Sequence, residues 1–307
     1  LGEGTLHLPH ATSLRMGRLG YQSDAQSALC VSYNHLDGYA RSLHGALIGS
    51  HPPYEALGIQ APDGSYRQLG TSLLQIENEF YSPIRPKRVT QPGERPLHAL
   101  RERGVEYVEV RCMDLQPELT VGIDQHTLRV LDVFLLWAMT SDSPPDSPQE
   151  IRDLVENQRL VAARGREPGL KLRRHGERVP LSDWAADVMA QGLPLARHLD
   201  EVHQGDAFTQ AWLKATQDLQ QTEHLPSARA LQAMQQLHAG EHAAFGLAAS
   251  DRVREALLAQ PLSADEREAA LLRANRSWQA QAEIEATDRL TFEAYRQQFL
   301  DPARLVV

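Results

Sequence analysis

The sequence predicts an α+β fold, in which part of an antiparallel sheet with covering helices is followed by a mainly helical C-terminal region. Two observations support this prediction. Segments with the two-residue alternation of strands occur in the first 145 residues, whereas almost every later segment favours helix. The clearest break in composition is the Ser/Pro/Asp-rich stretch at residues 141–148. We therefore expect two units, residues 1–145 and residues 146–307.

Strands and helices are mixed in the first unit. Residues 27–34 predict a strand, and residues 36–48 predict a helix because apolar side chains recur at helical spacing. That stripe consists of Leu36, Tyr39, Leu43 and Leu47. The further predictions, in order, are a turn at 62–65, a strand at 73–81, a loop at 90–96, a helix at 97–103 capped by Gly104, and a strand within 104–114.

The C-terminal region is predicted to consist of helices. Just before the break, residues 124–140 predict a largely buried helix, because they contain the longest apolar run. After it, helices are expected at 149–164, 181–200, 206–221, 226–239, 251–259 and 263–299. Ser263 and Glu266 have the spacing of a capping box. We expect the apolar stripe of Leu271, Leu272 and Trp278 to pack in the core.

Bulk composition narrows the class of protein. Hydrophobic residues make up 42% and charged residues 23% of the 307 residues, which is ordinary for a globular protein. A net charge of −9 argues against a dominant nucleic-acid surface. The apolar run at 130–139 is too short to cross a bilayer, and the first residues do not resemble a signal peptide. A cytoplasmic enzyme that binds neither nucleic acid nor membrane fits these properties, as do many other proteins.

Signals for zinc or disulfides are weak. Cys30 and Cys112 form no CxxC pair, and both fall in predicted strands, so we expect buried thiols. The stretch from His238 to His242 matches an H-x-x-E-H zinc pattern. However, Gly240 would interrupt the required helix at a cost of about 1 kcal/mol relative to Ala. No third ligand is evident, and a polar helix end or loop is the simpler interpretation.

Opposite charges lie side by side on the predicted strand within residues 104–114. Glu109 and Arg111 are two residues apart, so on a strand they project from the same face. Such a pair is unusual in a core but suits a face that lines a charged cavity. A carboxylate there can bind Mg²⁺, and an arginine can bind phosphate.

The segment 73–81 has a similar acidic pattern. Its predicted polar face carries Gln75, Glu77, Glu79 and Tyr81, and its apolar face carries Leu74, Ile76 and Phe80. Three cations follow directly, namely Arg85, Lys87 and Arg88. Carboxylates followed by cations suit a site for a metal-bound nucleotide, but a solvated antiparallel strand gives the same alternation and stays open. A nucleic-acid patch is disfavoured because the basic cluster is short and lies in an acidic chain.

Five motifs carry a resemblance to a known family. They are residues 8–15 (Leu-Pro-His-Ala-Thr-Ser-Leu-Arg), 19–21 (Leu-Gly-Tyr), 74–81 (Leu-Gln-Ile-Glu-Asn-Glu-Phe-Tyr), 83–89 (Pro-Ile-Arg-Pro-Lys-Arg-Val) and 106–111 (Glu-Tyr-Val-Glu-Val-Arg). In order and spacing they resemble bacterial glutamate–cysteine ligase of the proteobacterial type (γ-glutamylcysteine synthetase). The resemblance is strong from about residue 8 to residue 142 and reappears at 226–230.

The resemblance implies a fold and a reaction. The catalytic part of the protein would resemble glutamine synthetase, with the active site in the concave face of a curved antiparallel sheet. ATP would phosphorylate the γ-carboxylate of glutamate, and the amine of cysteine would displace the phosphate to give γ-glutamylcysteine, the first step of glutathione synthesis. Mg²⁺ would bridge carboxylates and nucleotide phosphates. Walker A and G-x-G-x-x-G sequences are absent, so the ATP site follows from the resemblance alone.

The resemblance also implies roles for single residues. Glu109 matches a metal-binding glutamate, and Arg111 matches a catalytic arginine near the transferred phosphoryl group. Arg15, Tyr21 and Tyr81 match residues that bind the cysteine substrate. The cations Arg85, Lys87 and Arg88 are expected to contact nucleotide phosphates. Glu77 and Glu79 are expected to line the active site as polar groups.

One departure from the family pattern bears on activity. In the family, a long N-terminal portion precedes the first motif and supplies most of the metal-binding carboxylates, whereas here the motif begins at Leu8. The resemblance therefore implies that the chain needs such a segment as a partner and is inactive alone. Two alternatives remain: a related carboxylate–amine ligase with another amine acceptor, and a non-catalytic amino-acid-binding module.

Overall fold

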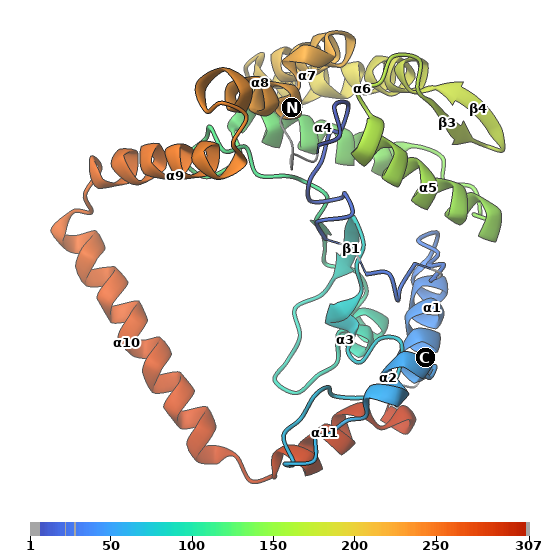
Figure 1. The fold of residues 1–307 in the computed structure, drawn as a ribbon, viewed down its shortest axis with the longest axis vertical. Coiled ribbons are helices and arrows are strands. Elements are labelled where there is room, and N and C mark those ends of the chain that lie inside the picture. Colours follow the sequence, from blue (N-terminus) through green and yellow to red (C-terminus); the bar gives the residue numbers. More distant parts are fainter. Residues whose placement is uncertain (1–6, 22, 28, 305–307) are drawn as a thin grey trace.

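Two groups of elements make up the fold, and one long helix is among the segments that connect them (Figure 1). The computed structural model describes residues 7–21, 23–27 and 29–304. The first group contains two short strands and three helices, and the second is a layer of helices with one hairpin. The predicted α+β class is confirmed.

The first group is built around the helix predicted at 36–48. Its elements are α1 (Leu36–Ile48), α2 (Pro52–Leu57), β1 (Ile84–Lys87), α3 (Pro96–Arg103) and β2 (Tyr107–Val110). Leu43 and Leu47 of the predicted stripe lie in the core, together with Leu74, Phe80 and Leu100 from other segments. Gly104 ends α3 with a φ of +72°, as predicted for a helix cap.

The strand predictions are only partly correct. β1 and β2 pair antiparallel, with Arg85 opposite Glu109. The prediction of a strand at 73–81 is wrong, because residues Glu77–Glu79 form a short 3₁₀ turn. Side chains from both the predicted polar face and the predicted apolar face are buried in the interior. The described residues of 27–34 form no strand either, although Val31 is buried in the core.

The second group is a layer of packed helices. Its elements are α4 (Gln125–Thr140), α5 (Pro148–Arg164), β3 (Lys171–Arg174), β4 (Glu177–Pro180), α6 (Leu181–His203), α7 (Ala207–Gln220), α8 (Pro226–Leu237) and α9 (His242–Leu258). Trp212 of α7 is buried against α6 and donates its indole N–H to the carbonyl of Met189 at 2.7 Å. Gly192 makes room for this ring, because a Cβ there would lie 2.2 Å from a Trp212 ring atom.

Three details of this layer differ from prediction. α4 is not largely buried: it packs on α6 and α7 along one side, and Val133 is its one buried residue. The β3–β4 hairpin was not predicted, because charged residues occupy most of its positions. Its turn is marked by His175 and Gly176, both with positive φ, which is the geometry that short hairpins favour. α9 begins at His242, earlier than the predicted 251.

The predicted helix over 263–299 is two helices, α10 (Ala264–Thr287) and α11 (Phe292–Leu300). The capping box of Ser263 and Glu266 is confirmed at the start of α10. The expected core packing is wrong: Leu271, Leu272 and Trp278 are 60%, 48% and 71% exposed. α10 runs alone from α9 to α11 (Figure 1), so these side chains find no partner among the described residues of this chain.

The two thiols also differ from expectation. Cys30 is exposed because its segment is not part of a sheet. Cys112 is half-buried, and burial raises the pKa of its thiol above the ordinary 9.0. Within the described part of the chain, no helix has the length and apolar character needed to cross a membrane.

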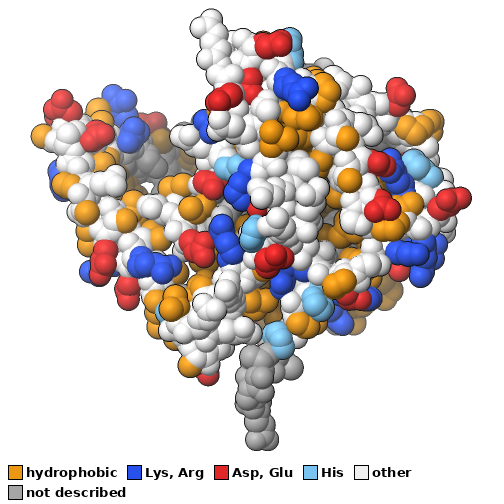
Figure 2. Space-filling model, turned by 90° about the horizontal axis from the view of Figure 1, so that it is seen from above, with side chains coloured by type: hydrophobic (Ala, Val, Ile, Leu, Met, Phe, Trp, Pro, Cys, Tyr) orange, Lys and Arg blue, Asp and Glu red, His pale blue; other side chains and the backbone are white. Residues whose placement is uncertain are grey.

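Charges of both signs are interspersed over the surface seen in Figure 2. Basic and acidic side chains alternate with apolar ones on that face, as expected for a chain that contains 31 basic and 40 acidic residues. This face therefore does not offer the continuous basic stripe of a nucleic-acid-binding surface.

Candidate functional site

The ring of Tyr21 lies at the centre of a group of predicted site residues. The guanidinium carbons of Arg15 and Arg111 lie 4.8 and 4.6 Å from its centroid, and the ring of Tyr81 lies 4.4 Å away. Arg15 and Tyr21 come from the N-terminal turns, Tyr81 from the segment before β1, and Arg111 from the residue after β2. Four residues from three segments that are far apart in the sequence are thus held by stacking and cation–π contacts.

The paired strands add further charges to this group. Arg85 of β1 donates from Nη2 to the hydroxyl of Tyr21 at 2.7 Å and from Nη1 to the carbonyl of Asn78 at 3.2 Å. Glu109, opposite it on β2, lies 3.6 Å from Lys87 and 3.2 Å from Arg111. We call Arg15, Tyr21, Tyr81, Arg85, Lys87, Glu109 and Arg111 the Tyr21 cluster.

The charge state of Glu109 follows from these neighbours. Burial raises the pKa of its carboxyl, but Lys87 and Arg111 outweigh burial and hold the pKa below the ordinary 4.5. Glu109 is therefore ionised at neutral pH and offsets part of the surrounding positive charge.

Positive charge remains in excess in the Tyr21 cluster. Its four cations face a single carboxylate. Arg85 is only 4% exposed, yet among the described residues no carboxylate lies within ion-pair distance of it. The Nε–H groups of Arg85 and Arg111 are buried without a hydrogen-bond acceptor. Buried guanidinium groups need acceptors, so the cluster is suited to bind an anion such as a carboxylate or phosphate.

Asp114 fixes the position of Arg15 in this cluster. Its Oδ1 accepts from the backbone N–H groups of Leu14 at 3.0 Å and Arg15 at 2.8 Å, and its Oδ2 accepts from the hydroxyl of Ser13. The Nε–H of Arg15 donates to the carbonyl of Arg111. Sequence reasoning missed Asp114, although a carboxylate just after a charged strand was a signal that could have identified it.

Gly20 and Gln26 shape the aromatic part of the cluster. The N–H of Tyr21 donates to the carbonyl of Arg15 at 2.5 Å. A Cβ on Gly20 would lie 2.1 Å from that carbonyl oxygen, so only glycine permits this turn. The side chain of Gln26 accepts from the N–H of Tyr81 at 3.0 Å and donates to the carbonyl of Glu79 at 2.8 Å.

Three residues with predicted site roles lie outside the cluster. Arg88 pairs with Glu106 at 3.6 Å and donates to the carbonyl of Arg103. Glu77 is buried in an ion pair with Arg95 at 2.8 Å, so it is not polar lining. Glu79 accepts from the N–H of Gln75 at 2.7 Å, which fixes the 3₁₀ turn. These interactions give the two glutamates structural roles.

Metal binding requires more ligands than this chain brings together. Within residues 7–21, 23–27 and 29–304, no three His, Cys, Asp or Glu side chains converge on a possible metal position. Glu109 alone, held by two cations, does not make the octahedral oxygen site that Mg²⁺ prefers. The zinc pattern is also broken, because His238 follows the last residue of α8, Gly240 has a φ of +80° and His242 begins α9.

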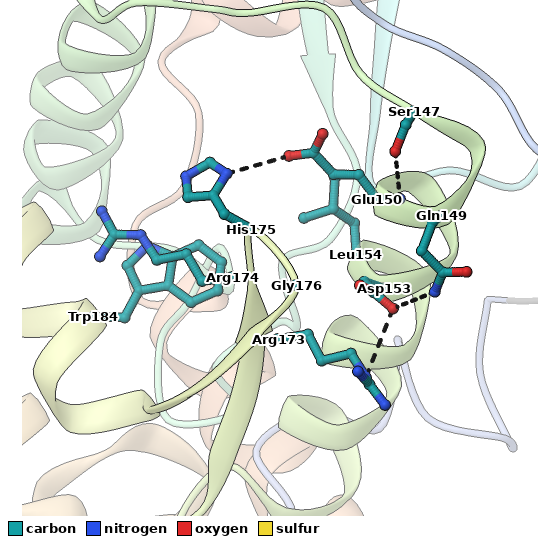
Figure 3. Close-up of a pocket in the computed structure, with 10 residues that line it drawn as sticks. All are labelled: Ser147, Gln149, Glu150, Asp153, Leu154, Arg173, Arg174, His175, Gly176 and Trp184. Carbon is teal, nitrogen blue, oxygen red and sulfur yellow. Dashed lines mark hydrogen bonds and ion pairs between the residues drawn. The ribbon is translucent and has the colours of Figure 1, made fainter.

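A separate pocket of about 250 Å³ lies between α5 and the β3–β4 hairpin (Figure 3). Polar side chains contact each other across it: Arg173 lies 3.7 Å from Asp153, and His175 lies 3.8 Å from Glu150. Trp184 forms another part of its wall. None of the residues predicted for the site lines this pocket, so it is distinct from the Tyr21 cluster.

Comparison with known proteins gives a consistent result. The sequence model of the family described as Glutamate-cysteine ligase matches residues 1–161, which is more than half of the 307 residues. A glutamate–cysteine ligase of Azotobacter vinelandii is 44% identical over 291 residues, and one of Hahella chejuensis is 40% identical over 303 residues. This chain belongs to the glutamate–cysteine ligase family. The family resemblance read from the five motifs is confirmed.

The relatives compared are longer than this chain. The matches cover 95% and 97% of this chain but 54% and 57% of the Azotobacter and Hahella relatives, so the chain spans about half of their length. The solved structure of a glutamate–cysteine ligase from Francisella tularensis in complex with AMP is 30% identical, with a TM-score of 0.88. That match covers 96% of this chain and 58% of the Francisella chain.

A more distant likeness shows the fold alone. A bifunctional glutathione synthetase from Pasteurella multocida matches 80% of this chain and 26% of its own, at 18% identity and a TM-score of 0.54.

Proposed function

We propose that this chain, completed by the part of the family fold that it does not span, ligates glutamate to cysteine at the expense of ATP. The observation that carries the proposal is the excess of cations in the Tyr21 cluster, with Arg85 buried and lacking an anionic partner among the described residues. The substrates of this reaction, namely ATP, glutamate and cysteine, all carry anionic groups. Family membership supports the reaction class.

The reaction has two steps. The γ-carboxylate of glutamate attacks the terminal phosphorus of ATP, which forms an acyl phosphate and releases ADP. The cysteine amine then attacks the acyl carbon, loses a proton, and expels inorganic phosphate. In such phosphoryl transfers the protein contributes mainly positioning and electrostatic stabilisation. The guanidinium donors of the Tyr21 cluster can supply both the positioning and the electrostatic stabilisation.

Separate parts of the Tyr21 cluster suit different substrates. We assign Arg111 to the transferred phosphoryl group, because it lies between Glu109 and the Tyr21 ring and its Nε–H is buried without an acceptor. Arg85 and Lys87, on the same strand, are assigned to nucleotide phosphates. Arg15, Tyr21 and Tyr81 are assigned to the cysteine site, where Arg15 would pair with the substrate carboxylate. Arg88 is not included, although its Nε–H is also buried without an acceptor, since its partners Glu106 and Arg103 lie outside the Tyr21 cluster.

Mg²⁺ would have to be held by Glu109 together with ligands from outside this chain. Glu109 is an ionised carboxylate in the Tyr21 cluster and can supply oxygen ligands. The remaining ligands would come from nucleotide phosphates, water and carboxylates in the part of the family fold that this chain does not span.

Substitution of Arg15 tests this assignment. In the completed protein, Arg15→Ala should raise the apparent KM for cysteine by about tenfold or more, which corresponds to about 1.4 kcal/mol, and should leave the KM for ATP almost unchanged. Arg18→Ala is the matched control, because Arg18 is an exposed cation three residues further along. A larger effect on ATP than on cysteine would contradict the assignment.

A further inference from the structure

The long helix α10 lacks the packing that normally stabilises a helix. None of its 24 residues is buried, although it carries large apolar side chains. Trp278 is 71% exposed and Leu271 60%, whereas Ile284, which is 65% exposed, lies on the other side of the helix. Most helical stability in proteins comes from the packing of an apolar face, and an isolated helix is marginal in water. Exposed groups of this size indicate a face that another polypeptide covers.

One side of α10 is suited to such a contact. Leu271 and Trp278 are seven residues apart, which is about two helical turns, so they lie on the same side of the helix. Ala274 and Ala282 lie near the same side and leave room for close approach. Ala280, nine residues after Leu271, lies on the opposite side.

Both ends of α10 are fixed to the rest of the molecule. At its N-terminal end, α9 packs on α8 of the helical layer. At its C-terminal end, α11 returns to the first group: Arg296 donates to the carbonyl of Leu69 at 2.6 Å, and Tyr66 donates to Glu293 at 2.7 Å. Figure 1 shows α10 as the connection between these two supports. Its position is therefore set by anchored neighbours.

The comparison with the Francisella ligase indicates what covers α10. That match includes 96% of this chain, so about 12 of the 307 residues are left out, which is fewer than α10 contains. At least about half of α10 therefore has a counterpart at a TM-score of 0.88. The matched region is 58% of the Francisella chain, so a large further part of that protein coexists with the same arrangement.

We propose that the Leu271–Trp278 side of α10 is the docking surface for the part of the family fold that this chain does not span. Packing there would bury the exposed tryptophan and leucine and hold that part between the helical layer and the first group. The proposal rests on family membership and on the exposure of α10, and it does not depend on the ligase activity proposed above.

Hydrogen exchange measured by mass spectrometry tests the docking surface. The chain would be measured alone and joined to the part of the Azotobacter relative that it does not span. Amides in residues 264–287 should exchange at least about tenfold more slowly in the joined protein. Leu271→Glu with Trp278→Glu should abolish this protection, while Ala280→Glu should preserve it. Glutamate is used because it keeps helix propensity high.

Each outcome of the hydrogen-exchange measurement either supports or overturns the proposed docking surface. Unchanged exchange in α10 of a joined protein whose added part is itself protected would overturn the proposal. If the added part does not fold on this chain, the intact Azotobacter relative gives the answer. Protection of its helix aligned with residues 264–287 is expected, and rapid exchange there would overturn the proposal. Because no measurement uses turnover, failure of the ligase activity would not affect the result.

Discussion

The carboxylate of Asp114 holds the backbone of Arg15, with 2.8 Å between Oδ1 and the amide nitrogen. The same oxygen accepts from the amide of Leu14 at 3.0 Å. These bonds join the N-terminal turn to the end of β2, where Arg111 lies. Asp114 therefore fixes the turn that carries Arg15, and the Nε–H of Arg15 in turn donates to the carbonyl of Arg111.

This relationship predicts that Asp114→Ala displaces Arg15. In the completed protein, we expect the apparent KM for cysteine to rise by about tenfold with a smaller change in kcat. Asp114→Asn should retain most of the function, because the amide oxygen can still accept from both N–H groups. Asp142→Ala, an exposed carboxylate in the loop after α4, is the control. Equal impairment in the Asn and Ala variants would show that the hydrogen bonds to Arg15 are not the cause.

The buried ion pair between Glu77 and Arg95 should contribute to stability rather than to substrate binding. Both side chains are 4% exposed, and two hydrogen bonds of 2.9 and 2.8 Å join them. Removing one partner leaves a buried charge, so Glu77→Ala should lower the free energy of unfolding by about 3–5 kcal/mol. Urea denaturation followed by circular dichroism measures this change.

The control for that measurement is Lys214→Ala, which removes an exposed pair with Asp218 and should cost less than about 1 kcal/mol. A Glu77→Ala protein that unfolds at the same urea concentration as the parent would contradict the structural role.

The two cysteines should differ in reactivity. Cys30 is exposed, whereas burial raises the pKa of the Cys112 thiol above 9.0, so little of its thiolate exists near neutral pH. Iodoacetamide should therefore modify Cys30 at least about tenfold faster at pH 7.5. The rate at Cys112 should rise as pH increases toward its pKa. Peptide mapping by mass spectrometry gives both rates, and a Cys112 rate that equals that of Cys30 in the folded protein would contradict the expected burial.

Local sequence patterns predicted the helices better than the strands. The stripe ending at Leu47 and the capping box at Ser263 each depend on neighbours three or four residues apart, so they are visible in the sequence. The alternation at 73–81 was misleading because the decisive interaction is the ion pair between Glu77 and Arg95, 18 residues apart. A pattern inside one segment contains no information about such a partner.

The same limit applies to the site and to α10. The family motifs identified Arg15, Tyr21, Tyr81, Arg85 and Arg111, and these residues come together in the structure. Asp114 was missed because its role is to bind backbone groups 99 and 100 residues away. For α10 the apolar side chains were correctly noted, but the prediction placed their partner within this chain.

Release of ADP tests the central claim most directly. The chain would be joined to the part of the Azotobacter relative that it does not span and incubated with Mg²⁺-ATP, omitting glutamate and cysteine in turn. We predict ADP release that requires both amino acids and is accompanied by γ-glutamylcysteine. Release with glutamate and a different amine would keep the chemistry but change the acceptor. A folded protein that binds cysteine and releases no ADP in any mixture would contradict the proposed ligase.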